Sequence, residues 1–262
     1  VELRTAQQRE AVAVYAGAAL AAIGDVENAL NATRTLEQRR ALLELATILG
    51  EELLAPELDF GRAVGRWTGV LATPHDLPPD VAAALGDLRD RDAPPAPGDS
   101  GGAAGLAVHV APVALLTADT PANLLGGSWH LAALTHPSPE ATWAAVALNV
   151  ALARLLQGHR DFVADVTEAL RSNAAPETLL SRVRRLPIIR REELAPAATA
   201  AACALETALW LSWHEPKPLR GLAWLAAQGA PAPTLAAATA LYGAHRGEDA
   251  IGELPVSIDS RA

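Results

Sequence analysis

One loop of this 262-residue chain carries side chains that could bind an anionic ligand. Thr135, His136 and Pro137 stand immediately before a predicted helix, and a helix N-terminus carries a partial positive charge. An imidazole and a hydroxyl at this place are typical of a site for a phosphate or carboxylate group. A cap and turn leading into the helix would use the same residue types, so local sequence leaves both interpretations open.

A glycine-rich segment supplies a second candidate. Gly101, Gly102 and Gly105 would let backbone N–H groups approach a phosphate, but no P-loop lysine follows them and a turn explains them equally. The overlapping string GDSGG (98–102) resembles the nucleophile loop of trypsin-like serine proteases. A catalytic serine needs a base positioned by the fold, and neither strands nor a disulfide support such a fold here. We therefore interpret 72–102, rich in Pro, Gly and Asp, as an exposed connection with one short helix inside it.

The other titratable residues are expected to be structural. The chain has no HExxH motif and no paired cysteines, so no metal-binding spacing is present. The pairs Glu51-Glu52 and Glu192-Glu193 are predicted to lie in polar, exposed surroundings. The stretch RVRRLPIIRR (182–191) makes a local basic patch that could contact a phosphate or an acidic partner. A solvated face is the simpler interpretation of such a run.

Composition excludes several functions. The net charge is −9 and the pI is near 5.3, whereas a nucleic-acid-binding protein needs a basic face. Cys203 is the single cysteine, so no internal disulfide can form, and a reducing cytoplasm is the expected location. The longest early apolar stretch, 11–24, is shorter than the ~20 residues that span a bilayer, so no membrane association is expected.

The spacing of apolar residues predicts a helical protein. Half of the residues are hydrophobic, Ala and Leu dominate, and no segment shows the alternation of a strand. Pro139 and Glu140 are typical of a first helical turn, and Gly158 is predicted as a C-cap. We predict a single all-α domain, 1–262, built as a compact bundle of roughly ten helices with a tail at 246–262. The predicted helices span 5–23, 36–54, 60–70, 122–135, 139–158, 161–172, 175–184, 195–213, 217–228 and 234–245, with a buried apolar segment at 105–116.

Four segments, in order and spacing, resemble one known family, the ADP-ribosylglycohydrolases. They are AGAALAAIGD (16–25), GGAAGLAVHVAPVALL (101–116), ALTHPSPEATWAAVALNVALARLLQG (133–158) and QGAPAPTLAAATALYGA (228–244). The third segment is the closest, since it follows the family's Thr-His-Pro-x-Pro-Glu-Ala helix nearly residue for residue. The resemblance implies an all-α fold with two divalent metals, usually magnesium, at its centre, and hydrolysis of an ADP-ribosyl bond.

The first group of family metal ligands is altered in this chain. It is a Thr-Asp-Asp at the start of an early helix, which matches Thr35, Leu36 and Glu37 here. The hydroxyl is kept, one carboxylate is replaced by leucine, and the other becomes glutamate. Asp25 remains from a Gly-Asp motif that closes the opening helix, and His109 stands where the family has an arginine. The region between Asp25 and Thr35 is also shorter than in active relatives, where it shapes the ligand cleft.

The second group of family ligands is lost more completely. The family's Asp-x-Asp-Thr falls on Pro231, Ala232, Pro233 and Thr234, so both aspartates are prolines. Magnesium requires six oxygens in near-octahedral array, held by carboxylates that offset its charge, and a proline side chain has no oxygen. We therefore expect no tight metal pair, no resident cofactor and little hydrolysis.

Three hypotheses follow from these residues. The first is a pseudoenzyme that keeps the fold and binds ADP-ribose or another nucleotide. The second is an active ADP-ribosyl hydrolase that uses magnesium through altered ligands, and the third is a helical interaction protein whose cleft is filled by side chains. No protein partner can be named from the sequence. The predicted ligand-binding residues are Gly101, Gly102, Gly105, His109, Thr135 and His136, and the positions vestigial for metal are Asp25, Thr35, Leu36, Glu37, Pro231, Pro233 and Thr234.

Overall fold

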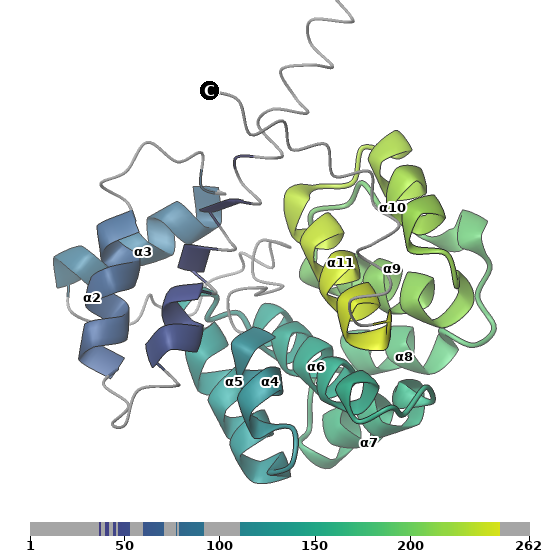
Figure 1. The fold of residues 1–262 in the computed structure, drawn as a ribbon, viewed down its shortest axis with the longest axis horizontal. Helices are drawn as coiled ribbons and strands as arrows, with labels where there is room; N and C mark the ends of the chain where they lie inside the picture. Colours follow the sequence, from purple (N-terminus) through teal and green to yellow (C-terminus); the bar gives the residue numbers. More distant parts are fainter. Residues whose placement is uncertain are drawn as a thin grey trace, which may run out of the picture.

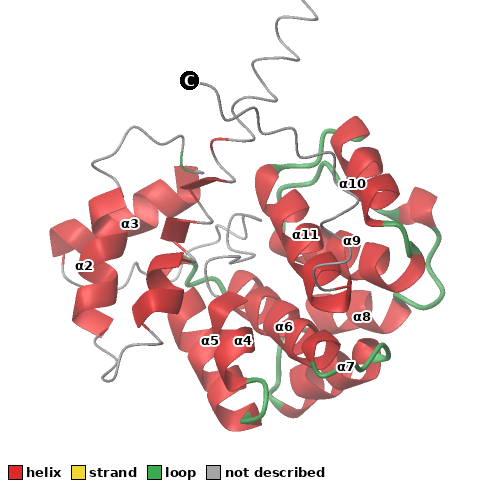
Figure 2. Ribbon diagram, in the orientation of Figure 1, coloured by secondary structure: helices red, strands yellow, loops and turns green. Residues whose placement is uncertain are grey.

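The fold is an all-α bundle, in agreement with the prediction from composition and spacing (Figure 1). The computed structural model describes residues 37, 40–41, 44–45, 47–52, 60–70, 77, 79–91 and 111–246. No β-strand occurs in these ranges (Figure 2). The helices are α2 (Phe60–Val70), α3 (Pro79–Arg91), α4 (Ala111–Thr117), α5 (Pro121–Thr135), α6 (Pro139–Leu156), α7 (Phe162–Ser172), α8 (Glu177–Arg185), the 3₁₀ turn η3 (Arg191–Glu193), α9 (Ala201–His214), α10 (Pro218–Ala227) and α11 (Ala232–Arg246).

Helix α6 is the centre of the bundle. Every residue from 144 to 153, AAVALNVALA, is buried, so the helix has no solvent-facing side over this stretch. A helix that is apolar all round is stable only when neighbours surround it. Helices α4, α5, α7, α9 and α11 supply this cover (Figure 1).

Small residues set the contact between α4, α5 and α6. A Cβ added to Gly127 would lie 3.3 Å from Val113 Cγ1, so this glycine allows α5 to approach α4 closely. Gly126, its neighbour, faces open space, and only one of the two glycines therefore serves packing. The buried Asn149 of α6 donates a hydrogen bond to Ser128 Oγ of α5 at 2.8 Å, which joins the two helices at a polar point inside the core.

The ends of α6 agree with the sequence signals. Ser138 Oγ accepts a hydrogen bond from the backbone N–H of Ala141 at 3.2 Å, with Pro139 and Glu140 in the first turn. Gly158 has φ +82°, and its N–H donates to the carbonyl of Leu155. The N–H of His159 donates to the carbonyl of Arg154, which completes a Schellman motif. The predicted C-cap role of Gly158 is confirmed.

The predicted helix over 195–213 begins later than expected. Helix α9 starts at Ala201, because Ala195 is followed by Pro196, which disfavours helical geometry in the residue before it. Ala200 has the extended angles φ −66° and ψ 134°, which fix the start. No described helix is long and apolar enough to cross a bilayer.

The expectation that Glu52 is exposed is wrong. Glu52 is 3% exposed, and it accepts hydrogen bonds from Arg66 Nη1 at 2.9 Å and from Arg62 Nε at 2.6 Å. The bond from Arg66, aided by Arg62, lowers the pKa of Glu52 below its ordinary value even though burial acts in the opposite direction. Both arginines lie on α2, so this ion pair joins α2 to the helical segment before it. Glu51 is exposed, as predicted.

The tight contact between α10 and α11 gives a stability prediction. A Cβ at Gly221 would lie 2.2 Å from the hydroxyl of Tyr242, and that hydroxyl donates to the carbonyl of Glu215 at 3.1 Å. Gly221→Ala should lower the free energy of unfolding by about 1–3 kcal/mol through overpacking. The matched control Gly126→Ala, in open space within a helix, should raise it by up to about 1 kcal/mol.

Urea denaturation of the two variants measures the difference. Adding Tyr242→Phe to Gly221→Ala should recover part of the loss, because it removes the clashing oxygen. A Gly221→Ala variant as stable as the parent would contradict this account of the contact.

Candidate functional site

Helix α11 begins in the segment that the resemblance aligns with the second group of metal ligands. The carbonyl of Pro231 accepts hydrogen bonds from the N–H groups of Thr234 at 3.0 Å and Leu235 at 3.2 Å, which makes Pro231 the cap residue. The helix therefore starts at Ala232, two residues before the predicted 234, and Pro233 is its second residue. A proline suits the first turn because the N–H groups there have no partner within the helix.

The chain enters this turn from a second Schellman motif. Gly229 has φ +67°, a conformation that favours glycine, and its N–H bonds the carbonyl of Ala226 at 3.0 Å. The N–H of Ala230 bonds the carbonyl of Leu225, also at 3.0 Å. Backbone hydrogen bonds thus organise the connection from α10 to α11, and no carboxylate lies in it.

Thr234 is the one residue of this segment with a potential ligand atom. Its side chain is 0% exposed, and its Oγ1 has no hydrogen-bond partner in the structure as described. A buried hydroxyl without a partner is unusual and costs free energy. In the family this hydroxyl belongs to the metal ligands, whereas here the neighbouring side chains are Pro231 and Pro233.

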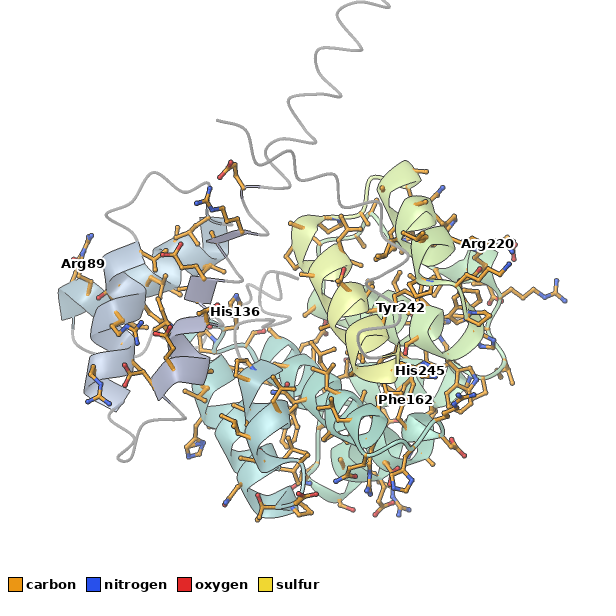
Figure 3. All side chains as sticks on the ribbon, viewed as in Figure 1. Arg89, His136, Phe162, Arg220, Tyr242 and His245 are labelled. Atoms are coloured by element: carbon orange, nitrogen blue, oxygen red, sulfur yellow. The ribbon has the colours of Figure 1, made fainter. Side chains whose placement is uncertain are left out.

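Thr135 and His136 are buried, at 2% and 1% exposed. Thr135 Oγ1 lies 3.4 Å from the carbonyl of Ala132 and 2.8 Å from His136 Nδ1. The side chain of His136, which is labelled in Figure 3, thus shares a hydrogen bond with the Thr135 hydroxyl. Thr142 Oγ1 of α6 donates to the carbonyl of His136 at 2.7 Å and fixes the loop on the helix. The structure therefore ties these side chains into the α5–α6 turn, and their role toward a ligand stays a prediction.

The other predicted positions are only partly described. Glu37 lies in a helical segment and is partly buried. Seven other positions lie outside the described residues, as does the predicted helix 5–23. They are Asp25, Thr35, Leu36, Gly101, Gly102, Gly105 and His109. Within the described part of the chain, no group of three or more His, Cys, Asp or Glu residues could hold a metal ion.

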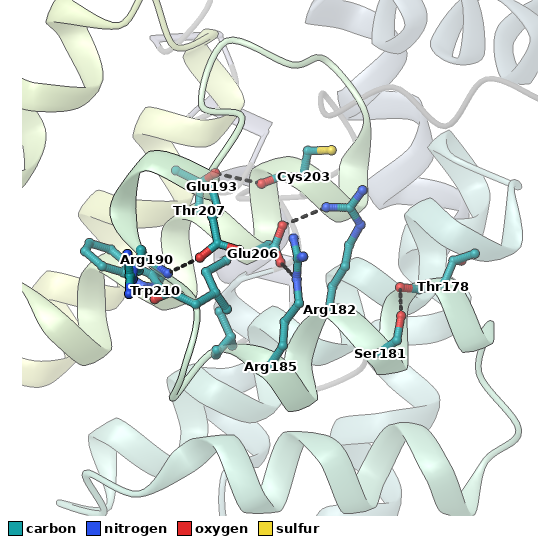
Figure 4. A network of polar contacts seen from close by, with 12 residues as sticks. Thr178, Ser181, Arg182, Arg185, Arg190, Glu193, Cys203, Glu206, Thr207 and Trp210 are labelled. Carbon is teal, nitrogen blue, oxygen red and sulfur yellow. Dashed lines mark hydrogen bonds and ion pairs between the residues drawn. The ribbon is translucent and has the colours of Figure 1, made fainter.

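Sequence reasoning missed a buried carboxylate on α9. The side chain of Glu206 is 2% exposed and is held by Arg182 Nη1 at 2.7 Å and Arg185 Nε at 2.6 Å, both from α8 (Figure 4). The bond to Glu206 raises the pKa of Arg185 above its ordinary value. Two of the five arginines of the predicted solvated face therefore form ion pairs between helices. A single acid within the apolar helix AACALETALW was the available signal.

A shallow pocket of about 210 Å³ lies between α5, α6 and α7. Its floor is apolar, and its rim carries the ion pair between Arg154 and Asp165, whose atoms are 2.8 Å apart. None of the sequence-predicted site residues lines it. Arg154 and Asp165 bond each other, and the third charged lining residue, Glu168, bonds Arg171 and Ser172, so the pocket offers a ligand little beyond apolar contact.

The comparison with known families decides the identity of the fold. The sequence model of the ADP-ribosylglycohydrolase family matches residues 29–255. The chain belongs to the ADP-ribosylglycohydrolase family. No curated protein matches the chain at a significant level. The family assignment drawn from the Thr-His-Pro segment and the order of the motifs is confirmed.

The two threonines of the site give a matched pair of substitutions. Thr234→Val replaces a buried hydroxyl without a partner, so the free energy of unfolding should stay the same or rise. Thr142→Val removes the 2.7 Å hydrogen bond to the carbonyl of His136 and should lower it by about 1–2 kcal/mol. Thermal and urea unfolding measure both values. A larger loss for Thr234→Val than for Thr142→Val would show that the Thr234 hydroxyl does have a partner in solution.

Proposed function

We propose that this chain is a catalytically degenerate ADP-ribosylglycohydrolase-like protein, a pseudoenzyme that keeps the family fold for binding. The observation that carries the proposal is the replacement of both aspartates of the second ligand group by Pro231 and Pro233. Family membership supplies the fold, but function depends on the residues of the site.

The geometry of α11 supports the proposal. Two metal ions need carboxylate oxygens on both sides of the site, and the α11 side offers only the hydroxyl of Thr234. Even the backbone oxygen of Pro231 is engaged, because it accepts two hydrogen bonds from the first turn. Asp25 and Glu37 would have to supply the carboxylate charge for two dications, with neutral hydroxyls from Thr35 and Thr234. These residues do not fit a magnesium pair.

Binding of ADP-ribose or a related nucleotide is part of the same proposal. The glycines at 101–105 and His109 are the residues that we assign to the ligand phosphates, with Thr135 and His136 supporting the neighbouring helix N-terminus. The single, unpaired Cys203 supports a reducing compartment such as the cytoplasm.

One observation favours a second candidate, a helical interaction protein with a filled cleft. Thr135, His136 and Thr234 are 2%, 1% and 0% exposed, so a ligand cannot reach these side chains without displacing what covers them. A titration with ligand separates the two candidates.

ADP-ribose should stabilise the protein saturably, and magnesium should not be needed. A ligand that binds only the folded state raises its stability by about 2.7 kcal/mol at a hundred times its Kd. Thermal unfolding with ADP-ribose up to millimolar concentration, with and without magnesium, measures this effect, with ribose as a control. A melting temperature that does not change with ADP-ribose would contradict nucleotide binding and favour the interaction protein. Magnesium-dependent release of ADP-ribose from a modified protein would instead establish an active hydrolase.

Restoring the lost carboxylates should restore metal binding. A variant with Leu36→Asp, Glu37→Asp, Pro231→Asp and Pro233→Asp recovers the family's acidic ligands, and we expect magnesium to raise its melting temperature saturably. The matched control carries Asn at the same four positions. Asn also caps helices and also removes the proline rings, so the two variants differ chiefly in charge. Equal magnesium-dependent stabilisation of the unmodified chain would contradict the pseudoenzyme proposal.

A further inference from the structure

Arg191 differs from the other cations of the basic patch in having shielded guanidinium nitrogens without a partner. Arg182 and Arg185 bind Glu206, and Arg184 Nη1 lies 3.4 Å from Glu177 Oε1. Arg190 and Arg191 make no ion pair in the described structure, but Arg190 is exposed to solvent. The guanidinium carbon of Arg191 lies 4.3 Å from the centroid of the Trp224 ring.

Two nitrogens of Arg191, Nε and Nη2, lie along one edge of its guanidinium group and have no hydrogen-bond partner in the described structure. Both nitrogens are shielded from solvent. The N–H bonds of these two nitrogens lie in the guanidinium plane and point away from the same edge, which is the fork that binds two oxygens of a carboxylate or phosphate at once. A buried donor without an acceptor is destabilising, and for a charged group the cost is larger.

The surrounding structure holds this edge in place. Trp210 Nε1 donates to the carbonyl of Ile189 at 3.0 Å, and His214 Nε2 lies 2.9 Å from the carbonyl of Leu186, so the loop before η3 is fixed to α9. On the other side, the indole of Trp224 packs against the core and sets the plane of the Arg191 guanidinium. A fork held in one orientation loses little entropy when it binds.

Two carboxylates on the elements around Arg191 have other partners. Glu193 Oε1 accepts from the backbone N–H of Arg190 at 2.9 Å, which closes the 3₁₀ turn η3. Glu215, just before α10, lies 3.4 Å from Arg220 Nε and also accepts from the N–H of Lys217 at 3.2 Å. Glu192 is exposed and does not bond the Nε or Nη2 atom of Arg191. Among the described residues, these two nitrogens therefore have no acceptor.

We propose that Arg191 is the recognition residue of an oxyanion site between η3 and α10, which binds a phosphate or carboxylate group of a ligand. The group would form two charge-assisted hydrogen bonds with Nε and Nη2 while Trp224 supports the guanidinium from its face. Because both nitrogens are covered, binding requires a local displacement at this edge, and the relief of two unsatisfied donors favours that displacement. The proposal uses none of the vestigial metal positions and does not depend on the proposed function.

The test uses the full chain with inorganic phosphate, acetate and chloride as probes at constant ionic strength. Phosphate or acetate should raise the melting temperature saturably beyond chloride, and the stronger of the two identifies the chemistry of the natural group. Arg191→Lys keeps the charge but removes the fork, so the apparent Kd should weaken by about 10- to 100-fold. The control Arg184→Gln, a cation of the same patch, should leave the response unchanged.

Tryptophan fluorescence tests whether the anion binds beside Trp224. The anion should change the fluorescence of the parent protein, and Trp224→Phe should abolish this change while the thermal response persists. No saturable response beyond chloride, or equal responses of Arg191→Lys and the parent, would overturn the proposal. A fluorescence change that survives in Trp224→Phe would also overturn it, since the anion would then bind elsewhere.

Discussion

The burial of α6 on every side is the constraint on which the rest of the bundle depends. Ten successive buried residues leave this helix no face for water, so each neighbour must present an apolar surface to it. Alanine supplies half of those positions, and small side chains let the surrounding axes approach closely. The polar exception, Asn149, is tolerated because Ser128 accepts its hydrogen bond on the facing helix.

Ion pairs connect the outer helices in the same manner at two separate places. Glu206 joins α9 to two arginines of α8, and Glu52 is held by two arginines of α2. In each case one buried carboxylate faces two partly exposed guanidinium groups. The charge is compensated at the boundary of the core, where long arginine side chains can keep contact with water. These carboxylates therefore link helices and are not available to a metal or a substrate.

Helix spans and helix ends could be predicted from the sequence where a few adjacent residues decide them. Helix α2 matches its predicted span, and Pro139 and Gly158 mark the ends of α6 because capping is decided by a few adjacent residues. Glu52, Glu206 and Arg191 could not be placed in this way. Their environments depend on residues 10 to 33 positions away, which only the packing of helices brings together. The candidate site has the same limit, since its residues come from distant segments, several of them outside the described ranges.

The connection between α10 and α11 is held by backbone hydrogen bonds and carries prolines at the positions of the family's aspartates. In this chain Gly229 closes α10, the carbonyl of Pro231 opens α11, and Pro233 fits the first turn. Each of these three features acts through the backbone, so the turn does not require a bound ligand to form. Proline also restricts the unfolded chain, which lowers the entropy cost of ordering the turn. Because the core is already complete around α6 and the turn is held by its own backbone, Pro231 and Pro233 are compatible with the fold at the positions where the family has aspartates.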